Sequence, residues 1–136
     1  MAESQPDAAM MAAVEKIARF IETGEDANLS AFAGSGVVIV ENFAPYLFDG
    51  PDAVARWAKE MRAHMAGTKD LKHSFGPATD FGITGDRAFF SLPTHWSGHA
   101  AGRHVDEDGG WAFVLTQQNG EWRVLSYGWA VTRVAP

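Results

Sequence analysis

The sequence predicts an α+β fold in which helices come first and a sheet of antiparallel strands follows. Apolar residues recur at helical spacing in the first part of the chain, and strand-like runs dominate from residue 71 onward. Glycine-containing turns separate these runs, and Asn119-Gly120 is the strongest hairpin signal among them. Helices followed by a meander of strands are typical of one α+β domain, and no linker or repeat divides residues 1–136.

The first half of the chain predicts three helices. Four apolar residues at helical spacing mark one face of the first helix: Met10, Val14, Ile17 and Ile21. Ser4 and Asp7 resemble a capping box at its start, and Gly24 marks its end. A shorter helix is expected over residues 26–33, and a third should begin near Pro51. The buried face of the third helix contains Val54, Trp57, Ala58, Met61 and Met65.

Strands are predicted on both sides of the third helix. The β-branched run at 37–40 is typical of a buried strand. Four further strands are expected over residues 71–84, 87–97, 103–118 and 121–133. The sequence also predicts irregularities in them: a bend at Gly76-Pro77, an interruption at Pro93 and a bulge within 108–110.

Composition excludes several classes of function. The formal net charge is −6 and the eleven Lys and Arg residues are scattered, so no nucleic-acid partner is expected. The chain has no cysteine, which excludes disulfides and thiolate chemistry. No apolar run approaches the ~20 residues of a membrane span, and the N-terminus does not resemble a signal peptide. A cytoplasmic protein without membrane contact, metal or cofactor is therefore expected.

The last two predicted strands are apolar on both faces. Strict alternation places Leu125, Tyr127, Trp129 and Val131 on one face of the last strand. It places Trp111, Phe113 and Leu115 of the preceding strand beside Val124, Ser126, Gly128 and Ala130. A sheet covered only by its own helices should alternate apolar with polar residues. The sequence therefore predicts a homodimer packed through this sheet face.

Two segments carry a resemblance to a known family. Residues 37–61 read VVIVENFAPYLFDGPDAVARWAKEM, and residues 110–130 read GWAFVLTQQNGEWRVLSYGWA. The first resembles the strand, loop and third helix of the nuclear transport factor 2-like superfamily, and the second resembles its closing hairpin. Within it, the chain is most similar to SnoaL-like proteins and ketosteroid isomerases. The resemblance implies a cone-shaped fold, with three N-terminal helices packed on a curved antiparallel sheet around a pocket.

The resemblance also implies roles for individual residues. The general base of the ketosteroid isomerases corresponds to Glu41, while their two oxyanion donors correspond to Phe20 and Ala112, which cannot donate. Ketosteroid isomerase activity is therefore not expected. Trp129 matches an aromatic residue that lines the isomerase cavity. The side chains expected to bind a ligand are Phe20, Tyr46, Trp57, Met61, Ala112, Tyr127 and Trp129.

The residues themselves also favour Glu41. It follows Ile39 by two positions, so both side chains fall on one strand face, and a carboxyl group buried there should have a raised pKa. A Glu41 in solvent beyond the strand end is the alternative. His73 and His95 lie on neighbouring predicted strands and could act as the two pocket histidines of the scytalone dehydratases, also members of this superfamily. The alternatives are surface histidines on a hairpin, or a metal cluster formed by His95, His99 and His104, which match no metal-binding motif.

Two functions remain open at this point. The first is a cavity that binds a small, largely apolar molecule and catalyses acid/base chemistry of the isomerase, dehydratase or cyclase type without a cofactor. Its candidate catalytic residues are Glu41, His73 and His95. The second is a non-enzymatic, dimeric association module with a vestigial cavity. Members of one fold superfamily differ widely in reaction, so the resemblance does not decide between them.

Overall fold

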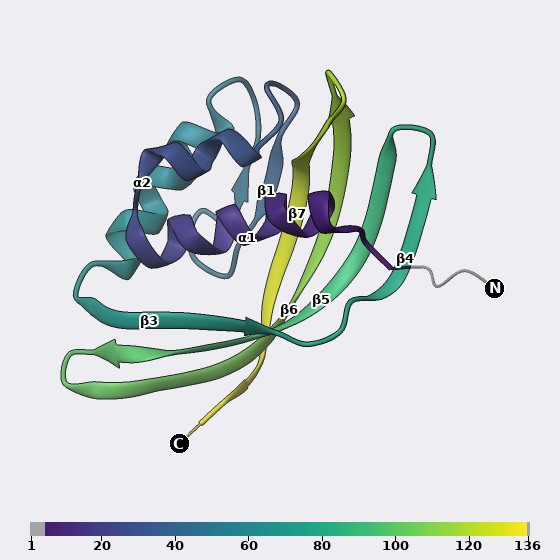
Figure 1. Ribbon diagram of the computed structural model, residues 1–136. Helices are drawn as coiled ribbons and strands as arrows, with labels where there is room; N and C mark the ends of the chain where they lie inside the picture. The colour runs from purple at the N-terminus through teal and green to yellow at the C-terminus, as the bar shows by residue number, and fades with distance from the viewer. Residues whose placement is uncertain (1–4, 136) are drawn as a thin grey trace.

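A computed structural model describes residues 5–135, and it shows helices packed against one side of a curved sheet (Figure 1). The helices are α1 (Ala8–Thr23), the 3-10 helix η1 (Asp26–Ala31) and α2 (Ala53–Met65). The predicted α+β class, with its helices before the main sheet, is confirmed. No helix among the described residues is long and apolar enough to cross a membrane.

The first helix ends at the predicted glycine but begins later than predicted, because Asp7 is its N-cap and its first residue is Ala8. The side chain of Asp7 accepts a hydrogen bond from the backbone N–H of Met10 at 2.9 Å, which caps the N-terminus. Gly24 adopts the left-handed conformation at the other end and donates its N–H to the carbonyl of Phe20 at 2.7 Å. Ser4, the other half of the predicted capping box, lies outside the described residues.

Seven strands form one sheet. They are β1 (Val38–Val40), β2 (Leu47–Phe48), β3 (Thr68–Phe75), β4 (Thr79–Thr84), β5 (Arg87–Ala100), β6 (Arg103–Gln118) and β7 (Glu121–Val134). Their order is β2-β1-β7-β6-β5-β3, with β4 also paired to β5. The predicted strand 71–84 is divided into β3 and β4 at the expected bend. One pair differs from the expected antiparallel sheet, because β1 runs parallel to β7.

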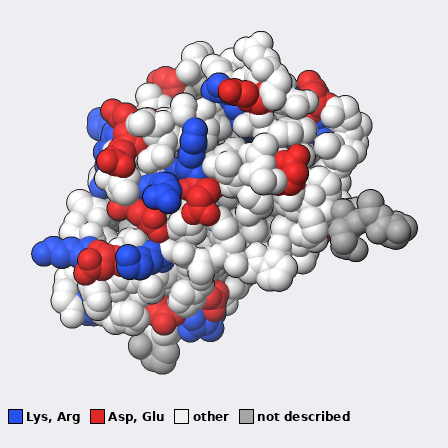
Figure 2. Space-filling model, in the orientation of Figure 1, with Lys and Arg blue, Asp and Glu red and all other residues white. Residues whose placement is uncertain are grey.

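The curvature of the longest strands brings the far end of the sheet under the helices. β5 and β6 bend so that their shared hairpin end, together with β3, lies below α1 and α2 (Figure 1). Charged side chains of both signs are interspersed over the left of this view, where α2 and β3 lie, without an extended basic area on this face (Figure 2). The bend is what creates space between the helix ends and the sheet.

A β-bulge at Leu125 overturns the predicted arrangement of the last two strands. The register passes from Val114 opposite Ser126 to Leu115 opposite Val124, which leaves Leu125 as the extra residue. Val124 therefore faces the core together with Tyr127, where strict alternation had placed them on opposite faces. On β6, the large side chains Trp111, Phe113 and Leu115 are also buried in this core. The sequence analysis predicted that these large side chains lie beside Ser126, Gly128 and Ala130, and the observed pairing shows that this prediction is wrong.

Candidate functional site

A cavity of about 280 Å³ lies between the C-terminal ends of the two α-helices and the curved end of the sheet. Its aromatic lining consists of Phe43, Trp96, Trp111 and Trp129. Its polar lining consists of Glu41, Asn42, His64, Thr68 and Glu107. A cavity with an apolar wall and a few converging polar groups is typical of small-molecule sites. A second hollow beside η1 has no comparable set of titratable groups in its lining.

Glu41 is the most deeply buried carboxylate of the cavity. Ile39 is fully buried, Val40 is 45% exposed and Glu41 is 4% exposed, so the alternation of β1 continues one residue past its end. Two neutral groups donate to Oε2 of Glu41: the indole N–H of Trp57 at 3.0 Å and the hydroxyl of Tyr127. Burial raises the pKa of the Glu41 carboxyl, and these hydrogen bonds offset part of that rise.

Tyr127 is held as a neutral phenol. Burial and the neighbouring charge of Glu41 raise the pKa of the Tyr127 hydroxyl well above its ordinary value. The hydroxyl therefore remains a donor to Glu41 at any pH at which the carboxyl titrates. Trp57 and Tyr127 come from α2 and β7, so one helix and one neighbouring strand fix the position of the Glu41 carboxylate.

A second carboxylate lies at the sheet side of the cavity. Glu107 comes from the bent end of β6, and partial burial raises the pKa of its carboxyl group. The charge of His64, near the end of α2, lowers the pKa of Glu107 and so offsets part of this rise. The imidazole of His64 stacks on Phe43, with ring centroids 4.5 Å apart. The sequence analysis missed both Glu107 and His64.

Five of the seven predicted ligand-binding residues lie in the cavity wall or in the layers behind it. Met61 and Trp129 line the cavity. Trp57 and Tyr127 are buried behind Glu41 and contact its carboxylate rather than the open space. Phe20 lies one layer further back, with its ring centroid 5.2 Å from that of Trp57.

Two predicted pocket residues lie elsewhere. Tyr46 is 60% exposed in the loop before β2 and does not line the cavity. Ala112 is exposed on the outer face of β6, because the inward positions of this strand are those of Trp111 and Phe113. Ala112 therefore cannot line the cavity, because alternate residues of a strand face opposite sides of the sheet.

His73 fastens helix α1 to strand β3 instead of facing the cavity. Its Nδ1 lies 2.6 Å from Oε2 of Glu22, which also accepts the backbone N–H of His73 at 2.9 Å. Its Nε2 contacts Glu15, about two helical turns earlier on α1. Both ring nitrogens are therefore engaged by carboxylates of α1, and neither is directed to the cavity. Neither glutamate was singled out by the sequence analysis.

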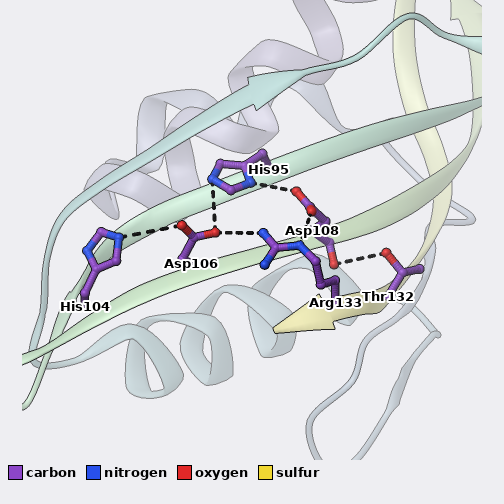
Figure 3. A network of polar contacts seen from close by, with 6 residues as sticks. All are labelled: His95, His104, Asp106, Asp108, Thr132 and Arg133. Carbon is purple, nitrogen blue, oxygen red and sulfur yellow. Dashed lines mark hydrogen bonds and ion pairs between the residues drawn. The ribbon is translucent and has the colours of Figure 1, made fainter. Parts of the chain in front are cut away.

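His95 lies on the other face of the sheet. Its strand neighbour Trp96 is paired with His73 and faces inward, so His95 faces outward. There its Nδ1 lies 2.6 Å from Asp108, which also accepts from Arg133 at 2.6 Å (Figure 3). These two partners lower the pKa of the Asp108 carboxyl. The structure does not bring His73 and His95 together, and the predicted pair of pocket histidines is not formed.

The position of Trp129 depends on the absence of a side chain at Gly109. A Cβ at Gly109 would lie 2.3 Å from Cη2 of Trp129 and 2.6 Å from the carbonyl oxygen of Ala130. The indole of Trp129 therefore lies directly over the backbone of β6 and forms part of the cavity wall.

We expect Gly109→Ala to destabilise the protein by about 1–3 kcal/mol, as overpacking commonly does. Urea unfolding monitored by tryptophan fluorescence would measure the loss. Gly110→Ala is the matched control, because a Cβ at Gly110 would meet nothing within 4 Å. Equal stability of the two variants would show that Trp129 does not lie against Gly109.

Comparisons with known proteins identify the fold. No family model and no curated protein matches the sequence. Solved structures do match. The Kfla4162 protein from Kribbella flavida superposes with a TM-score of 0.79 and 12% identity, covering 94% of this chain and 91% of that one. Hexachlorocyclohexane dehydrochlorinase LinA-type3 from Novosphingobium barchaimii also gives a TM-score of 0.79, at 9% identity, covering 95% and 88%.

A third similar structure connects the chain to the resemblance in its sequence. It is a protein of Shewanella frigidimarina with a provisional assignment as a ketosteroid isomerase. Its TM-score is 0.71 at 21% identity, and the match covers 91% of this chain and 96% of that one. The chain therefore has the nuclear transport factor 2-like fold expected from its sequence. Identities this low establish the fold and leave the reaction to be argued from the site.

Proposed function

We propose that this protein binds a small, largely apolar molecule in the cavity and transfers a proton to or from it through Glu41, without a cofactor. The observation that carries the proposal is the environment of Glu41: a carboxylate buried in the cavity wall, with a raised pKa and two neutral donors. General acid/base catalysis is most efficient when the pKa of the catalytic group lies near the working pH. A raised carboxyl pKa moves Glu41 in that direction.

The surroundings of Glu41 support a role as proton acceptor. Both side-chain hydrogen bonds converge on its Oε2, and the backbone of Asn42 also interacts with the carboxyl group. The neutral donors offset only part of the rise that burial causes, so the pKa of the carboxyl stays raised, whereas pairing with a Lys or Arg would favour the charged form further. Abstraction of a proton next to an electron-withdrawing group is the step shared by isomerases, dehydratases and cyclases of this kind. His73 and His95 have no part in the proposal, since neither lines the cavity.

The test combines a binding screen with a proton-exchange assay. Small apolar carbonyl compounds are screened by thermal shift, because a ligand that binds only the folded state raises the melting temperature. Each ligand found is then incubated in D2O with the protein, and exchange of its acidic C–H is followed by NMR. We expect Glu41→Gln to retain binding and to slow exchange by about 10²–10⁴-fold, the usual contribution of a positioned base.

Glu25→Gln is the matched control, since Glu25 is exposed at the start of η1, away from the cavity lining. It should leave both binding and exchange unchanged. Undiminished exchange in Glu41→Gln would exclude Glu41 as the base. A screen in which no compound shifts the melting temperature would count against the cavity as a binding site.

A second candidate function, association through the sheet, is favoured by the outer face. On this face small side chains surround Gly128: Ala112, Val114, Ser126 and Ala130 on the two last strands. Val40 of β1 lies beside them and is 45% exposed. We propose that two copies of the chain pack through this face, whose composition differs from the one predicted because Trp111 and Phe113 belong to the core.

A further inference from the structure

Three tryptophan rings from neighbouring strands bound the cavity at steep angles to one another. The ring centroids of Trp96 and Trp111 are 6.1 Å apart, with an angle of 82° between the rings. Those of Trp111 and Trp129 are 5.4 Å apart, at 67°. These are edge-to-face contacts, so the three rings pack against one another, and all three also line the cavity. The face of an aromatic ring attracts cations, and tryptophan does so most strongly.

The charges of the lining have one sign. Glu41 and Glu107 are its carboxylates, and no Lys or Arg among residues 5–135 lines the cavity. His64 is the basic side chain of the lining, and it packs against Phe43 at the helix side. An anionic ligand would meet two carboxylates without a fixed positive charge to balance it. Glu107 is already partly buried. A neutral ligand would displace more water from its carboxylate without supplying a charge to pair with it, which costs free energy.

We propose that the cavity selects a small organic cation: an ammonium group on an apolar body, with the charge lying between the tryptophan rings and Glu107. The apolar body would pack against the aliphatic side of the lining, where Met61 and Ile21 lie. The inference rests on the proposed function for the location of the binding site. It adds the charge of the ligand, which Glu41 acting as a base does not require.

Proton linkage distinguishes a cationic from a neutral ligand by sign. A cation favours the charged form of nearby carboxylates, so its binding lowers the pKa values of Glu41 and Glu107 and releases protons. A neutral ligand deepens the burial of the same carboxylates, raises their pKa values and takes protons up. The two ligand classes therefore give opposite proton counts.

The experiment compares three probes of nearly equal size and different charge: 2-phenylethylammonium, 2-phenylethanol and phenylacetate. Titration calorimetry in two buffers of different ionisation enthalpy gives the affinity and the number of protons exchanged. We expect the ammonium to bind about tenfold or more tightly than the alcohol, a difference of roughly 1.4 kcal/mol. We also expect proton release with the ammonium, and the weakest binding with phenylacetate.

Two variants test whether the preference for the ammonium over the alcohol arises in the cavity. Glu107→Gln should lower the ratio of ammonium to alcohol affinity severalfold, and Trp129→Leu should do the same by removing a ring face while keeping an apolar wall. Glu25→Gln, which removes an equal charge from an exposed residue outside the lining, should leave the ratio unchanged. Alcohol that binds as well as the ammonium would overturn the inference and leave the proposed binding function intact. Failure of the ammonium to bind would overturn it as well.

Discussion

Replacing Glu41 with glutamine should make the folded protein more stable at neutral pH and leave its stability unchanged in acid. The folded-state pKa of Glu41 is raised above its ordinary value of 4.5, chiefly by burial. A group with a raised folded-state pKa contributes stability below its unfolded pKa, and that contribution is lost as the pH rises through the folded pKa. Wild-type protein should therefore lose stability relative to Glu41→Gln as the pH rises from the ordinary pKa of 4.5 through the raised folded-state pKa.

The amide suits this site because it keeps the acceptor that the neighbours need. One oxygen of Glu41 accepts from both Trp57 and Tyr127, and the carbonyl oxygen of glutamine can do the same. Glu41→Leu is the contrasting variant, since it leaves two buried donors without an acceptor. Each such donor costs about 1–3 kcal/mol, so Glu41→Leu should be destabilised at every pH.

Urea unfolding across this pH range measures all three proteins. The difference between wild type and Glu41→Gln isolates Glu41 from the other carboxyls that titrate, Glu107 among them. If the two stability curves stay parallel from acid to neutral pH, Glu41 does not have a raised pKa and the basis for its role as proton acceptor is lost. A stabilising Glu41→Gln would mean that the native residue is retained against stability, as functional residues often are.

The burial of Glu41 could be predicted because it depends only on the period of a strand. Ile39, Val40 and Glu41 alternate between core and solvent with no insertion between them, so sequence spacing gives the correct face. Trp129 was placed by the resemblance of the closing hairpin, which the fold confirms. Local periodicity and an ordered set of elements were sufficient for both residues.

Glu107 and His64 could not be found in this way. They approach each other because β6 bends beneath the end of α2, and the degree of bending is a property of the whole sheet. Period-two alternation says which face Glu107 occupies, and it gives no information about which helix lies above that face. By sequence alone, the acidic run 106–108 is typical of solvated charge on a hairpin. In the structure, Asp106 and Asp108 do contact Arg133 on the outer face, while Glu107 between them faces inward.

The bulge at Leu125 was equally beyond a pattern-based prediction. Bulges are often marked by glycine, and the sequence around this one reads VLSY, a regular β-forming run. One extra residue in a strand moves every side chain before it to the opposite face of the sheet. This shift moved Val124 into the core. The prediction of a pair of pocket histidines was wrong for a related reason. His73 and His95 lie on opposite faces of the sheet, and the sequence did not give the pairing register of their strands.

The outer face of β6 and β7 carries small side chains of the kind that suit the centre of a protein interface. Ala112 and Gly128 are directly paired across β6 and β7, and Val114 is paired with Ser126 beside them. Phe89 of β5 is 38% exposed at one margin, while His95, Asp108 and Arg133 form a polar network at the far end (Figure 3). Small residues allow two sheets to approach closely, and a polar rim around an apolar centre is usual for protein interfaces.

Gly128→Glu should therefore abolish a dimer formed through this face and leave the single chain folded. An added Cβ at Gly128 would lie 3.8 Å from Cβ of Val40, which is ordinary contact, so the variant is tolerated within one subunit. In a two-fold dimer each subunit would bury an unpaired carboxylate, at a cost of about 3 kcal/mol or more. The dissociation constant should then rise at least about a hundredfold.

Sedimentation equilibrium at micromolar concentration measures the result, against a chain mass of 14.7 kDa. Gly34→Glu is the matched control, because it introduces the same charge at an exposed loop glycine, where a Cβ would meet only the Gln118 side chain, at 3.9 Å. It should leave a wild-type dimer intact. A wild-type mass equal to that of one chain would rule out the dimer, and a Gly128→Glu protein that still sediments as two chains would place its interface on a different surface.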